Sequence, residues 1–162
     1  MAEKKRDRGR ASLAVADVMV KDVMTVDEDA MVKEAAGVMD KLEIGCLIAV
    51  KKGKATGILT ERDMLKRIVA ASRDAVKTRV KDIMSSPLVV VESRTDLEKA
   101  VRLMFQMKIK KLPVVDGKRL VGVVTLTDVA RFQPQMMRIL QELAAREATP
   151  RSMKQVVDRY VV

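Results

Sequence analysis

Short apolar runs alternate along the chain with stretches in which apolar residues recur at helical spacing. The runs cover residues 23–26, 47–50 and 55–59, then 88–91, 112–115 and 120–124, and each predicts a β-strand. After the first run of each group, apolar positions recur three and four residues apart, which predicts a helix with one buried face. These positions are Val32, Ala35, Ala36, Val38, Met39 and Leu42, and then Leu97, Ala100, Val101, Leu103, Met104 and Met107.

The two groups of elements are copies of one unit. Shifting the sequence by 65 residues aligns residues 15–65 with residues 80–130 without a gap, and a fixed period of this kind indicates a structural repeat. A competing match of residues 20–24 with 80–84 needs an insertion directly afterwards, so we interpret it as a chance similarity. Identical pairs in the chosen register are Val15/Val80, Asp17/Asp82, Met19/Met84, Val26/Val91, Ala35/Ala100, Met39/Met104, Ile44/Ile109, Val50/Val115, Gly57/Gly122, Thr60/Thr125 and Asp63/Asp128.

Polar residues mark the ends of the predicted helices. Thr95 and Glu98 have the spacing of a capping box at the start of the second-copy helix, and Asp29 can cap the equivalent helix of the first copy. A last helix is predicted to open at Thr60 in one copy and at Thr125 in the other. Each copy therefore predicts the order strand, helix, strand, strand, helix.

One copy alone is too small to bury an adequate core. The Asp116-Gly117 pair is a strong hairpin signal between the last two strands of the second copy. We therefore expect an α/β (α+β) fold in which two β-α-β-β-α repeats pack sheet against sheet around one core, with pseudo-two-fold symmetry. Beyond them, Pro134 and Thr149-Pro150 predict two further helices within 134–162, which pack on the repeats or bridge a dimer.

Composition narrows the function. The chain has 162 residues, 48% of them hydrophobic and only 2% aromatic, with one cysteine (Cys46) and no histidine. The commonest general base and metal ligand is thus missing, which argues against an enzyme and against a metal site. No apolar run approaches the roughly 18–20 residues that span a bilayer, and no signal-peptide pattern opens the chain. We therefore expect a soluble, cytoplasmic protein with no membrane partner.

The chain carries a formal net charge of +10. Residues 1–10 form a basic tail that we expect to be disordered, but much of the excess is spread along the repeats. A diffuse positive charge favours anionic partners, either nucleic acid or small phosphates, and does not choose between them. A nucleic-acid-binding protein is therefore the alternative function.

A tandem β-α-β-β-α pair with these motifs resembles the CBS (cystathionine β-synthase) domain family, in the arrangement called a Bateman module. The resemblance rests on Asp-Val-Met and Asp-Ile-Met before the first strand of each copy and on Leu-Pro-Val-Val-Asp-Gly at the second hairpin. It rests further on two segments with the pattern Gly-hydrophobic-x-Thr-x-x-Asp, at 57–63 and 122–128. The implied domains are repeat 1 at 11–73 and repeat 2 at 74–133, between the tail 1–10 and the helical extension 134–162.

The Thr-x-x-Asp segments have two interpretations. Thr60 with Asp63, and Thr125 with Asp128, have capping-box spacing, so each pair can simply begin a helix. In the CBS family the same geometry holds an adenosine nucleotide, with the Thr hydroxyl on phosphate and the carboxylate on the ribose hydroxyls. The resemblance thus raises ligand binding above capping alone.

The resemblance also implies two shared clefts. In the family, the Thr-x-x-Asp segment of one repeat faces strands of the other. One cleft would combine Thr125, Thr127, Asp128 and Lys111 with Val20, Met24, Ile44 and Gly45. The other would combine Thr60, Arg62 and Asp63 with Ser85, Val89, Ile109 and Lys110.

The two clefts should differ, because Lys111 and Pro113 of the second copy match Cys46 and Ile48 of the first. A basic residue at the Lys111 position contacts phosphate in some family members, so we expect the Lys111 cleft to be the better phosphate binder. The alternative is that Lys108, Lys110 and Lys111 form a solvated basic turn.

The expected function is that of a non-catalytic regulatory module sensing AMP, ADP, ATP or an S-adenosyl compound. It would need no cofactor or metal, would pair as a homodimer, and would act on an unidentified regulated protein.

Overall fold

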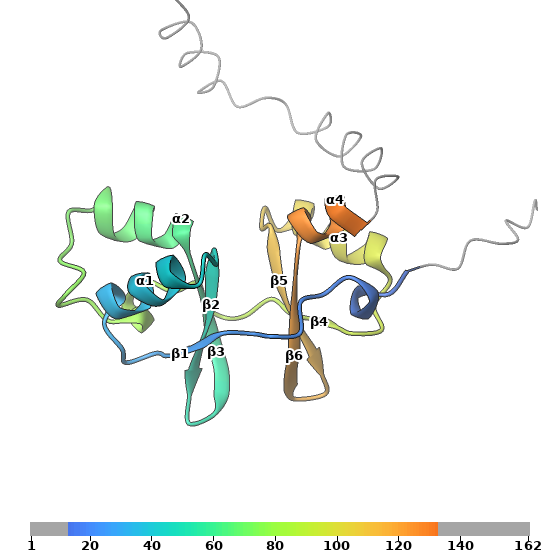
Figure 1. Cartoon of the computed structure of the whole chain (residues 1–162), viewed down its shortest axis with the longest axis horizontal. Helices are drawn as coiled ribbons and strands as arrows, with labels where there is room; N and C mark the ends of the chain where they lie inside the picture. The colour runs from blue at the N-terminus through green and yellow to red at the C-terminus, as the bar shows by residue number, and fades with distance from the viewer. Residues whose placement is uncertain (1–12, 133–162) are drawn as a thin grey trace, which may run out of the picture.

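In the computed structural model, which describes residues 13–132, each repeat forms a three-stranded sheet with helices on its outer face (Figure 1). Short 3-10 turns, η1 (Val15–Asp17) and η3 (Val80–Asp82), precede the two repeats. The elements of the first half are β1 (Thr25–Asp27), α1 (Val32–Lys41), β2 (Cys46–Lys51), β3 (Lys54–Thr60), α2 (Glu61–Met64) and the π-helical turn η2 (Leu65–Val69). Those of the second half are β4 (Val91–Glu92), α3 (Leu97–Gln106), β5 (Lys111–Asp116), β6 (Arg119–Thr125) and α4 (Leu126–Phe132).

The two sheets share one topology. In the first, β1 pairs parallel to β2 and β2 pairs antiparallel to β3, and β4, β5 and β6 repeat this order. The strand register shifts after Ala49 in one hairpin and after Val114 in the other, at positions 65 residues apart. Gly53 (φ +75°) and Gly117 (φ +61°) sit in the two hairpin turns, where positive φ favours glycine. The hydrogen bonding thus confirms both the fold and the predicted register.

The opening segment of each repeat packs on the other repeat. Val15 N donates to Thr95 O at 2.8 Å, and Val20 exchanges two backbone hydrogen bonds of 2.9 Å with Val123 on β6. The later segment mirrors this arrangement, since Ser85 exchanges hydrogen bonds of 2.8 and 3.0 Å with Ile58 on β3. In Figure 1 the blue N-terminal stretch accordingly begins beside the second half and then crosses to the first. The packing units therefore differ from the sequence repeats.

Buried residues form two clusters, and the expectation of one core was wrong. Leu47 and Ala49 point toward α1, whereas Ile48, fully buried between them in sequence, points to the opposite face of β2. The sheets lie side by side at the centre of the molecule with the helices outside (Figure 1), so each repeat keeps its own core between sheet and helices. The exchanged segments contribute to these cores: Val15 to the second and Val80 to the first.

The motif glycines allow the exchanged segments to approach closely. A Cβ on Gly122 would lie 2.6 Å from Met19 Sδ and 3.0 Å from the Val20 carbonyl oxygen. A Cβ on Gly57 would meet Met84 Sδ at 2.5 Å and the Ser85 carbonyl oxygen at 3.0 Å. The glycine of the Gly-x-x-Thr-x-x-Asp pattern is therefore required by the crossing of chain segments, whatever the Thr and Asp do.

Both first strands begin later than predicted. β1 starts at Thr25 and β4 at Val91, whereas the apolar runs that predicted them begin at residues 23 and 88. Val20 and Ser85 are still paired to the sheet of the other repeat. The residues that follow them must therefore cross between the sheets before they can join a ladder.

The two predicted helix caps were wrong. Asp96, not Thr95, caps α3 by accepting from Lys99 N at 3.2 Å, while the Thr95 carbonyl is taken by the crossing segment. Met31 occupies the N-cap position of α1, and Asp29 instead accepts from Arg79 and Lys81. The exchanged segment thus engages the Asp29 carboxylate, whereas α3 begins one residue later than the Thr95–Glu98 spacing predicts.

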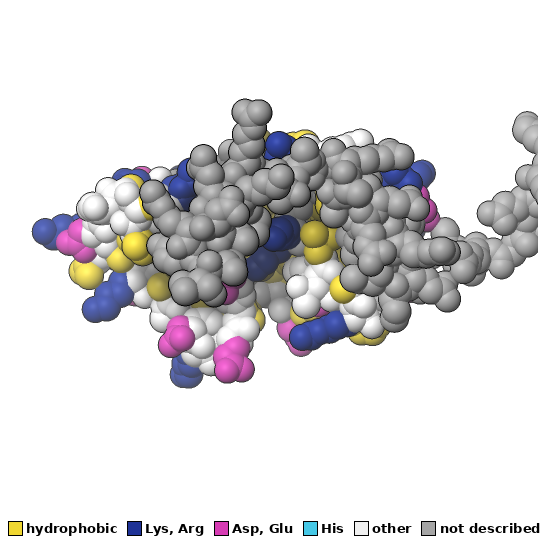
Figure 2. Space-filling view, turned by 90° about the horizontal axis from the view of Figure 1, so that it is seen from above, with side chains coloured by type: hydrophobic (Ala, Val, Ile, Leu, Met, Phe, Trp, Pro, Cys, Tyr) yellow, Lys and Arg dark blue, Asp and Glu magenta, His cyan; other side chains and the backbone are white. Residues whose placement is uncertain are grey.

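The face in Figure 2 shows how the charges are distributed. On its visible part, Lys and Arg side chains lie on both halves and are interspersed with Asp and Glu. The same spread was expected from the sequence. Among residues 13–132 no helix is long and apolar enough to cross a membrane. The predicted tail at 1–10 and the predicted helices within 134–162 lie outside the described residues.

Candidate ligand-binding site

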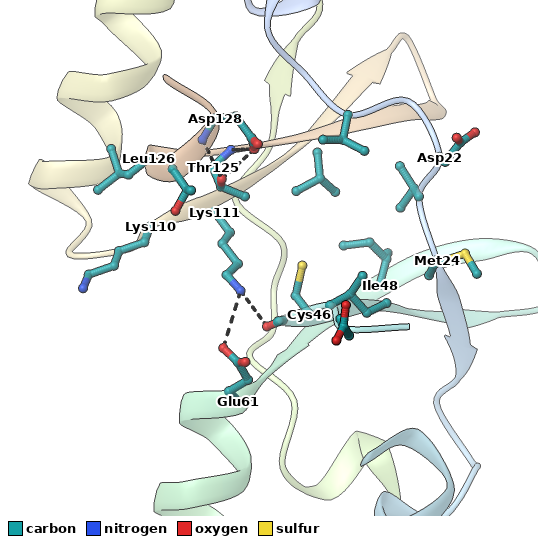
Figure 3. A pocket seen from close by; sticks show the side chains of 17 residues that line it. Asp22, Met24, Cys46, Ile48, Glu61, Lys110, Lys111, Thr125, Leu126 and Asp128 are labelled. Carbon is teal, nitrogen blue, oxygen red and sulfur yellow. Dashed lines mark hydrogen bonds and ion pairs between the residues drawn. The ribbon is translucent and has the colours of Figure 1, made fainter. Parts of the chain in front are cut away.

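A cavity of about 530 Å³ lies between the two repeats, beside the Thr125–Asp128 segment. Its walls come from the first crossing segment, the start of β2, the start of β5 and the first turn of α4 (Figure 3). The structure brings together in it all eight residues predicted for the first cleft. We call it the Asp128 cleft. Those eight lining residues are Val20, Met24, Ile44, Gly45, Lys111, Thr125, Thr127 and Asp128.

Thr125 and Asp128 form the expected reciprocal cap. Thr125 N donates to Asp128 Oδ2 at 3.0 Å, Thr125 Oγ1 donates to the same oxygen at 2.5 Å, and Asp128 N donates to Thr125 Oγ1 at 3.2 Å. Among residues 13–132, no donor is bonded to the other carboxylate oxygen, Oδ1. Capping therefore uses one oxygen of Asp128 and leaves the second able to accept from a ligand.

Lys111 reaches across the interface into the first repeat. Its Nζ donates to the Gly45 carbonyl oxygen at 2.6 Å and lies 4.0 Å from Glu61 Oε2 (Figure 3). Its side chain is 24% exposed, whereas that of Glu61 is 75% exposed at the rim. The ammonium group predicted to meet phosphate is thus already engaged by a carbonyl and a nearby carboxylate.

The equivalent site at Asp63 is filled by the protein itself. Asp63 Oδ2 accepts from Thr60 as in the other repeat, but Oδ1 accepts from Ser85 Oγ at 3.0 Å and lies 3.1 Å from Arg67 Nη1. The same Arg67 nitrogen also donates to the Ile83 and Met84 carbonyl oxygens, at 2.5 and 2.9 Å. Both carboxylate oxygens of this Asp63 site are therefore occupied, and Asp63 is 7% exposed.

The difference between the sites follows from two substitutions in the repeat. At the period of 65 residues, Val20 stands where the other copy has Ser85, and Phe132 stands where it has Arg67. Neither side chain can donate a hydrogen bond to Asp128. A difference between the two sites was predicted, but from another pair of positions, Lys111 in the second repeat and Cys46 in the first. The residues that close one site are Arg67 and Ser85.

The other residues predicted for the second cleft are dispersed. Arg62 is exposed, and Val89 and Ile109 pack against the core of the second repeat. Lys110 was misplaced: it lies in the lining of the Asp128 cleft, where its carbonyl oxygen accepts from Leu126 N. Its side chain points away from Thr125 and Asp128 (Figure 3).

Sequence reasoning missed three carboxylates and several apolar residues of the Asp128 cleft. The β2–β3 register pairs Cys46 with Thr60, which brings the start of β2 and residue 61 to the same sheet edge. That pairing was a signal for Cys46 and Glu61, whereas Asp22 and Glu43 lie in connections whose course only the structure shows. The missed lining residues are Asp22, Val23, Glu43, Cys46, Ile48, Glu61, Val123 and Leu126.

Cys46 is the only thiol in the chain, and it lines the cleft. Burial raises the pKa of Cys46, and the Lys111 charge only partly opposes this shift. The thiol is thus protonated near neutral pH and is a poor nucleophile. Among residues 13–132, no group of three or more His, Cys, Asp or Glu side chains is arranged to hold a metal ion.

A second cavity, of about 1110 Å³, lies between the two hairpins. It is lined on both sides by equivalent residues, for example Val50 and Val115, and by Lys54 and Arg119. None of the predicted site residues contributes to it. The Asp128 cleft is therefore the candidate site.

Comparison with known protein families agrees with this geometry. The family model described as "CBS domain" matches residues 15–70 and again residues 80–134. The chain belongs to the CBS-domain family. CBS-domain pairs are regulatory modules, and the match covers both sheets and the Asp128 cleft.

Related proteins carry CBS pairs in two contexts. This chain is 39% identical over 117 residues to CBS domain-containing protein YhcV of Bacillus subtilis, a match covering 72% of this chain and 83% of YhcV. It is also 38% identical over 126 residues to inosine-5′-monophosphate dehydrogenase of Methanocaldococcus jannaschii, covering 75% of this chain but only 24% of that enzyme. CBS pairs thus occur alone and as a small part of enzymes.

Solved structures show the same fold. The CBS domain pair of protein MJ0100, in complex with 5′-methylthioadenosine and S-adenosyl-L-methionine, matches with a TM-score of 0.69 and 27% identity, over 76% of this chain and 98% of that one. A protein with CBS domains from Burkholderia ambifaria matches with a TM-score of 0.70 and 28% identity, over 76% of this chain and 94% of that one.

Proposed function

We propose that this CBS pair is a non-catalytic regulatory module that binds one adenosine compound per chain in the Asp128 cleft. The observation that carries the proposal is the Asp128 carboxylate, which has one oxygen bonded within its cap and one without a described donor, at the wall of a cavity between the repeats. AMP, ADP, ATP and S-adenosyl compounds share the adenosine unit that this site would recognise.

The chemistry of the cleft suits adenosine. A carboxylate oxygen can accept from both vicinal hydroxyls of a ribose, and charge-assisted hydrogen bonds of this kind are the stronger ones. Val20, Ile44, Ile48 and Val123 supply an apolar surface for a base. The related CBS domain pair of MJ0100 was solved in complex with two adenosine compounds, which supports the same assignment.

The position of the cleft suggests how binding would be transmitted. Its lining joins the first crossing segment and the start of β2 to the start of β5 and the first turn of α4. A ligand there touches both repeats, so it stabilises one relative placement of the repeats over others. We propose that this change is passed to a homodimer partner or to a regulated protein in the cytoplasm.

The Asp63 site provides the internal control. Because Arg67 and Ser85 occupy its carboxylate, we propose that it takes no ligand. Isothermal titration calorimetry with AMP, ADP, ATP, S-adenosylmethionine and 5′-methylthioadenosine tests both statements. At least one compound should bind with a stoichiometry of one per chain, and Asp128→Ala should weaken it at least about tenfold, the loss expected for a charge-assisted contact.

Asp63→Ala is the matched variant and should leave the affinity within about twofold, a change of less than one RT, because Asp63 does not line the Asp128 cleft. Absence of heat with every compound would overturn the proposal. Equal losses in the two Asp variants would overturn the assignment to the Asp128 cleft.

A further inference from the structure

The charges that line the Asp128 cleft bear on which adenosine compound fits. Four carboxylates line it and only two amines, so its formal charge is negative although the whole chain is strongly positive. The carboxylates belong to Asp22, Glu43, Glu61 and Asp128, and the amines to Lys110 and Lys111; the carboxylate of Asp22 points outward, away from Thr125 and Asp128 (Figure 3).

The two lysines are poorly placed to offset an anionic ligand. Lys111 Nζ is bonded to the Gly45 carbonyl oxygen and lies near Glu61, so its charge is already shared. Lys110 is exposed, and its side chain points away from Thr125 and Asp128 (Figure 3). Neither ammonium group is directed at the open oxygen of Asp128.

The backbone donors at the start of α4 are also consumed. Thr125 N donates to Asp128, Leu126 N donates to the Lys110 carbonyl oxygen, and Asp128 N donates to Thr125 Oγ1. Among the N–H groups of residues 125–128, only that of Thr127 has no acceptor within residues 13–132. A polyphosphate normally needs several such donors or an unpaired cation, because its charge must otherwise be stripped of water without compensation.

We infer that the Asp128 cleft selects adenosine compounds whose 5′ substituent carries no net negative charge, such as a thioether or a sulfonium, over nucleotides with a polyphosphate. This inference rests on the proposed adenosine site and narrows it. The carboxylates at the rim repel phosphate and attract a cationic substituent, and Cys46 and the apolar residues of the lining offer apolar surface to an uncharged one.

Calorimetry of the full chain at low salt tests the inference with ligands that differ in charge. S-adenosylmethionine is a net cation, S-adenosylhomocysteine and 5′-methylthioadenosine are neutral overall, and AMP, ADP and ATP are increasingly anionic. The first three should bind at least about tenfold more tightly than ATP, and affinity should fall from AMP to ADP to ATP.

A charge variant separates electrostatics from shape. In Glu43→Gln/Glu61→Gln the affinity for S-adenosylmethionine should fall by about three- to tenfold while that for ATP rises, because two rim charges are removed without a change of size. Glu92→Gln, an exposed carboxylate outside the cleft, should move neither.

The outcomes are distinct. If none of the six compounds binds, the proposed adenosine site itself is wrong and the inference falls with it. If ATP or ADP binds more tightly than 5′-methylthioadenosine and this binding is lost in Asp128→Ala, the adenosine site stands and the charge selection is overturned. If both ligand classes respond alike to the double variant, the rim carboxylates do not select.

Discussion

Nη1 of Arg67 lies 3.1 Å from Oδ1 of Asp63. The same nitrogen donates hydrogen bonds to two backbone carbonyl oxygens of the segment that crosses from the second repeat. The position equivalent to Arg67 in the other repeat is Phe132, which is 63% exposed. One cationic side chain thus occupies a site in one repeat that its counterpart leaves open in the other.

Arg67→Met should lower the free energy of unfolding by about 1–3 kcal/mol. Breaking a buried ion pair costs more than this range, but the Arg67 side chain is 39% exposed and water compensates part of the loss. Urea unfolding followed by circular dichroism measures the change. Arg73→Met is the control, because within residues 13–132 the Arg73 side chain makes only one hydrogen bond, a 3.5 Å contact on the surface with the Asp82 carbonyl oxygen. Equal stability of the two variants would contradict a structural role for Arg67.

Gly122→Ala and Gly57→Ala should each destabilise the fold by about 1–3 kcal/mol, the cost of forcing a methyl group into a packed site. The added Cβ would lie 2.6 Å from Met19 Sδ in the first variant and 2.5 Å from Met84 Sδ in the second. Gly37→Ala provides the contrast: nothing lies within 4 Å of its added Cβ in α1, so stability should rise by about 0.5–1 kcal/mol. Thermal unfolding distinguishes the two signs, and a gain at Gly122 would refute the close approach.

Cys46 should react slowly with iodoacetamide near neutral pH. Burial raises the pKa of its thiol, so the alkylation rate should be at least about tenfold below that of the chain unfolded in urea, and should increase as pH rises toward that pKa. Because the chain has a single cysteine, mass spectrometry of the intact protein reports this site alone. A ligand in the Asp128 cleft should slow the reaction further. Faster labelling in the folded than in the unfolded chain would exclude this environment.

The ion pair between Glu28 and Lys51 should make the free energy of unfolding depend on pH. The hydrogen bond from Lys51 Nζ, 2.6 Å long, holds the pKa of Glu28 below its ordinary value. The ionised carboxylate therefore stabilises the fold at pH values above the ordinary pKa of a glutamate. Its contribution to stability is lost as the pH falls through the lowered pKa of Glu28. Lys51→Met should accordingly be less stable than the wild type at pH 7, with the difference vanishing in strong acid.

Urea unfolding at several pH values checks this dependence. Lys77→Met is the matched variant, because Lys77 faces Asp74 at 3.8 Å with its side chain 84% exposed, and such a pair contributes little. Its stability should follow the wild type at every pH. A constant deficit of Lys51→Met across the range would mean that packing, not the ion pair, was lost.

Much of the fold could be predicted because its signals are local. The hairpins, both long helices and the Thr-x-x-Asp caps depend on residues close together in sequence, and the repeat at 65 residues reinforces each signal with a second copy. The predicted cap at Asp29 was wrong because Arg79 and Lys81, distant in sequence, bind its carboxylate, and the one at Thr95 was wrong because the neighbouring Asp96 caps α3. A capping pattern records propensity, and at Asp29 tertiary contacts overrode it.

The candidate site was predicted less evenly. Resemblance to the family brought together the eight residues that line the Asp128 cleft, because they stand at matched motif positions. The closure of the Asp63 site depends on Arg67 and Ser85. The i,i+4 spacing of Arg67 from Asp63 can be read from the sequence, but the approach of Ser85 to Asp63 cannot. The rim carboxylates Asp22 and Glu43 lie on connections, where neither periodicity nor motif places a side chain.

The exchange of opening segments has a consequence for how this chain can be made and inherited. Val15 is synthesised before β1, and its acceptor Thr95 only after the whole first sheet, so the second core closes around a segment made long before the rest of that core. A gene fragment encoding residues 11–73, the first sequence repeat, would lack the Val80 that completes its own core and would carry the Val15 that belongs to the other. Neither sequence repeat is therefore a separable module, because each core is completed by a segment of the other repeat, and a copy of the pair keeps both cores whole.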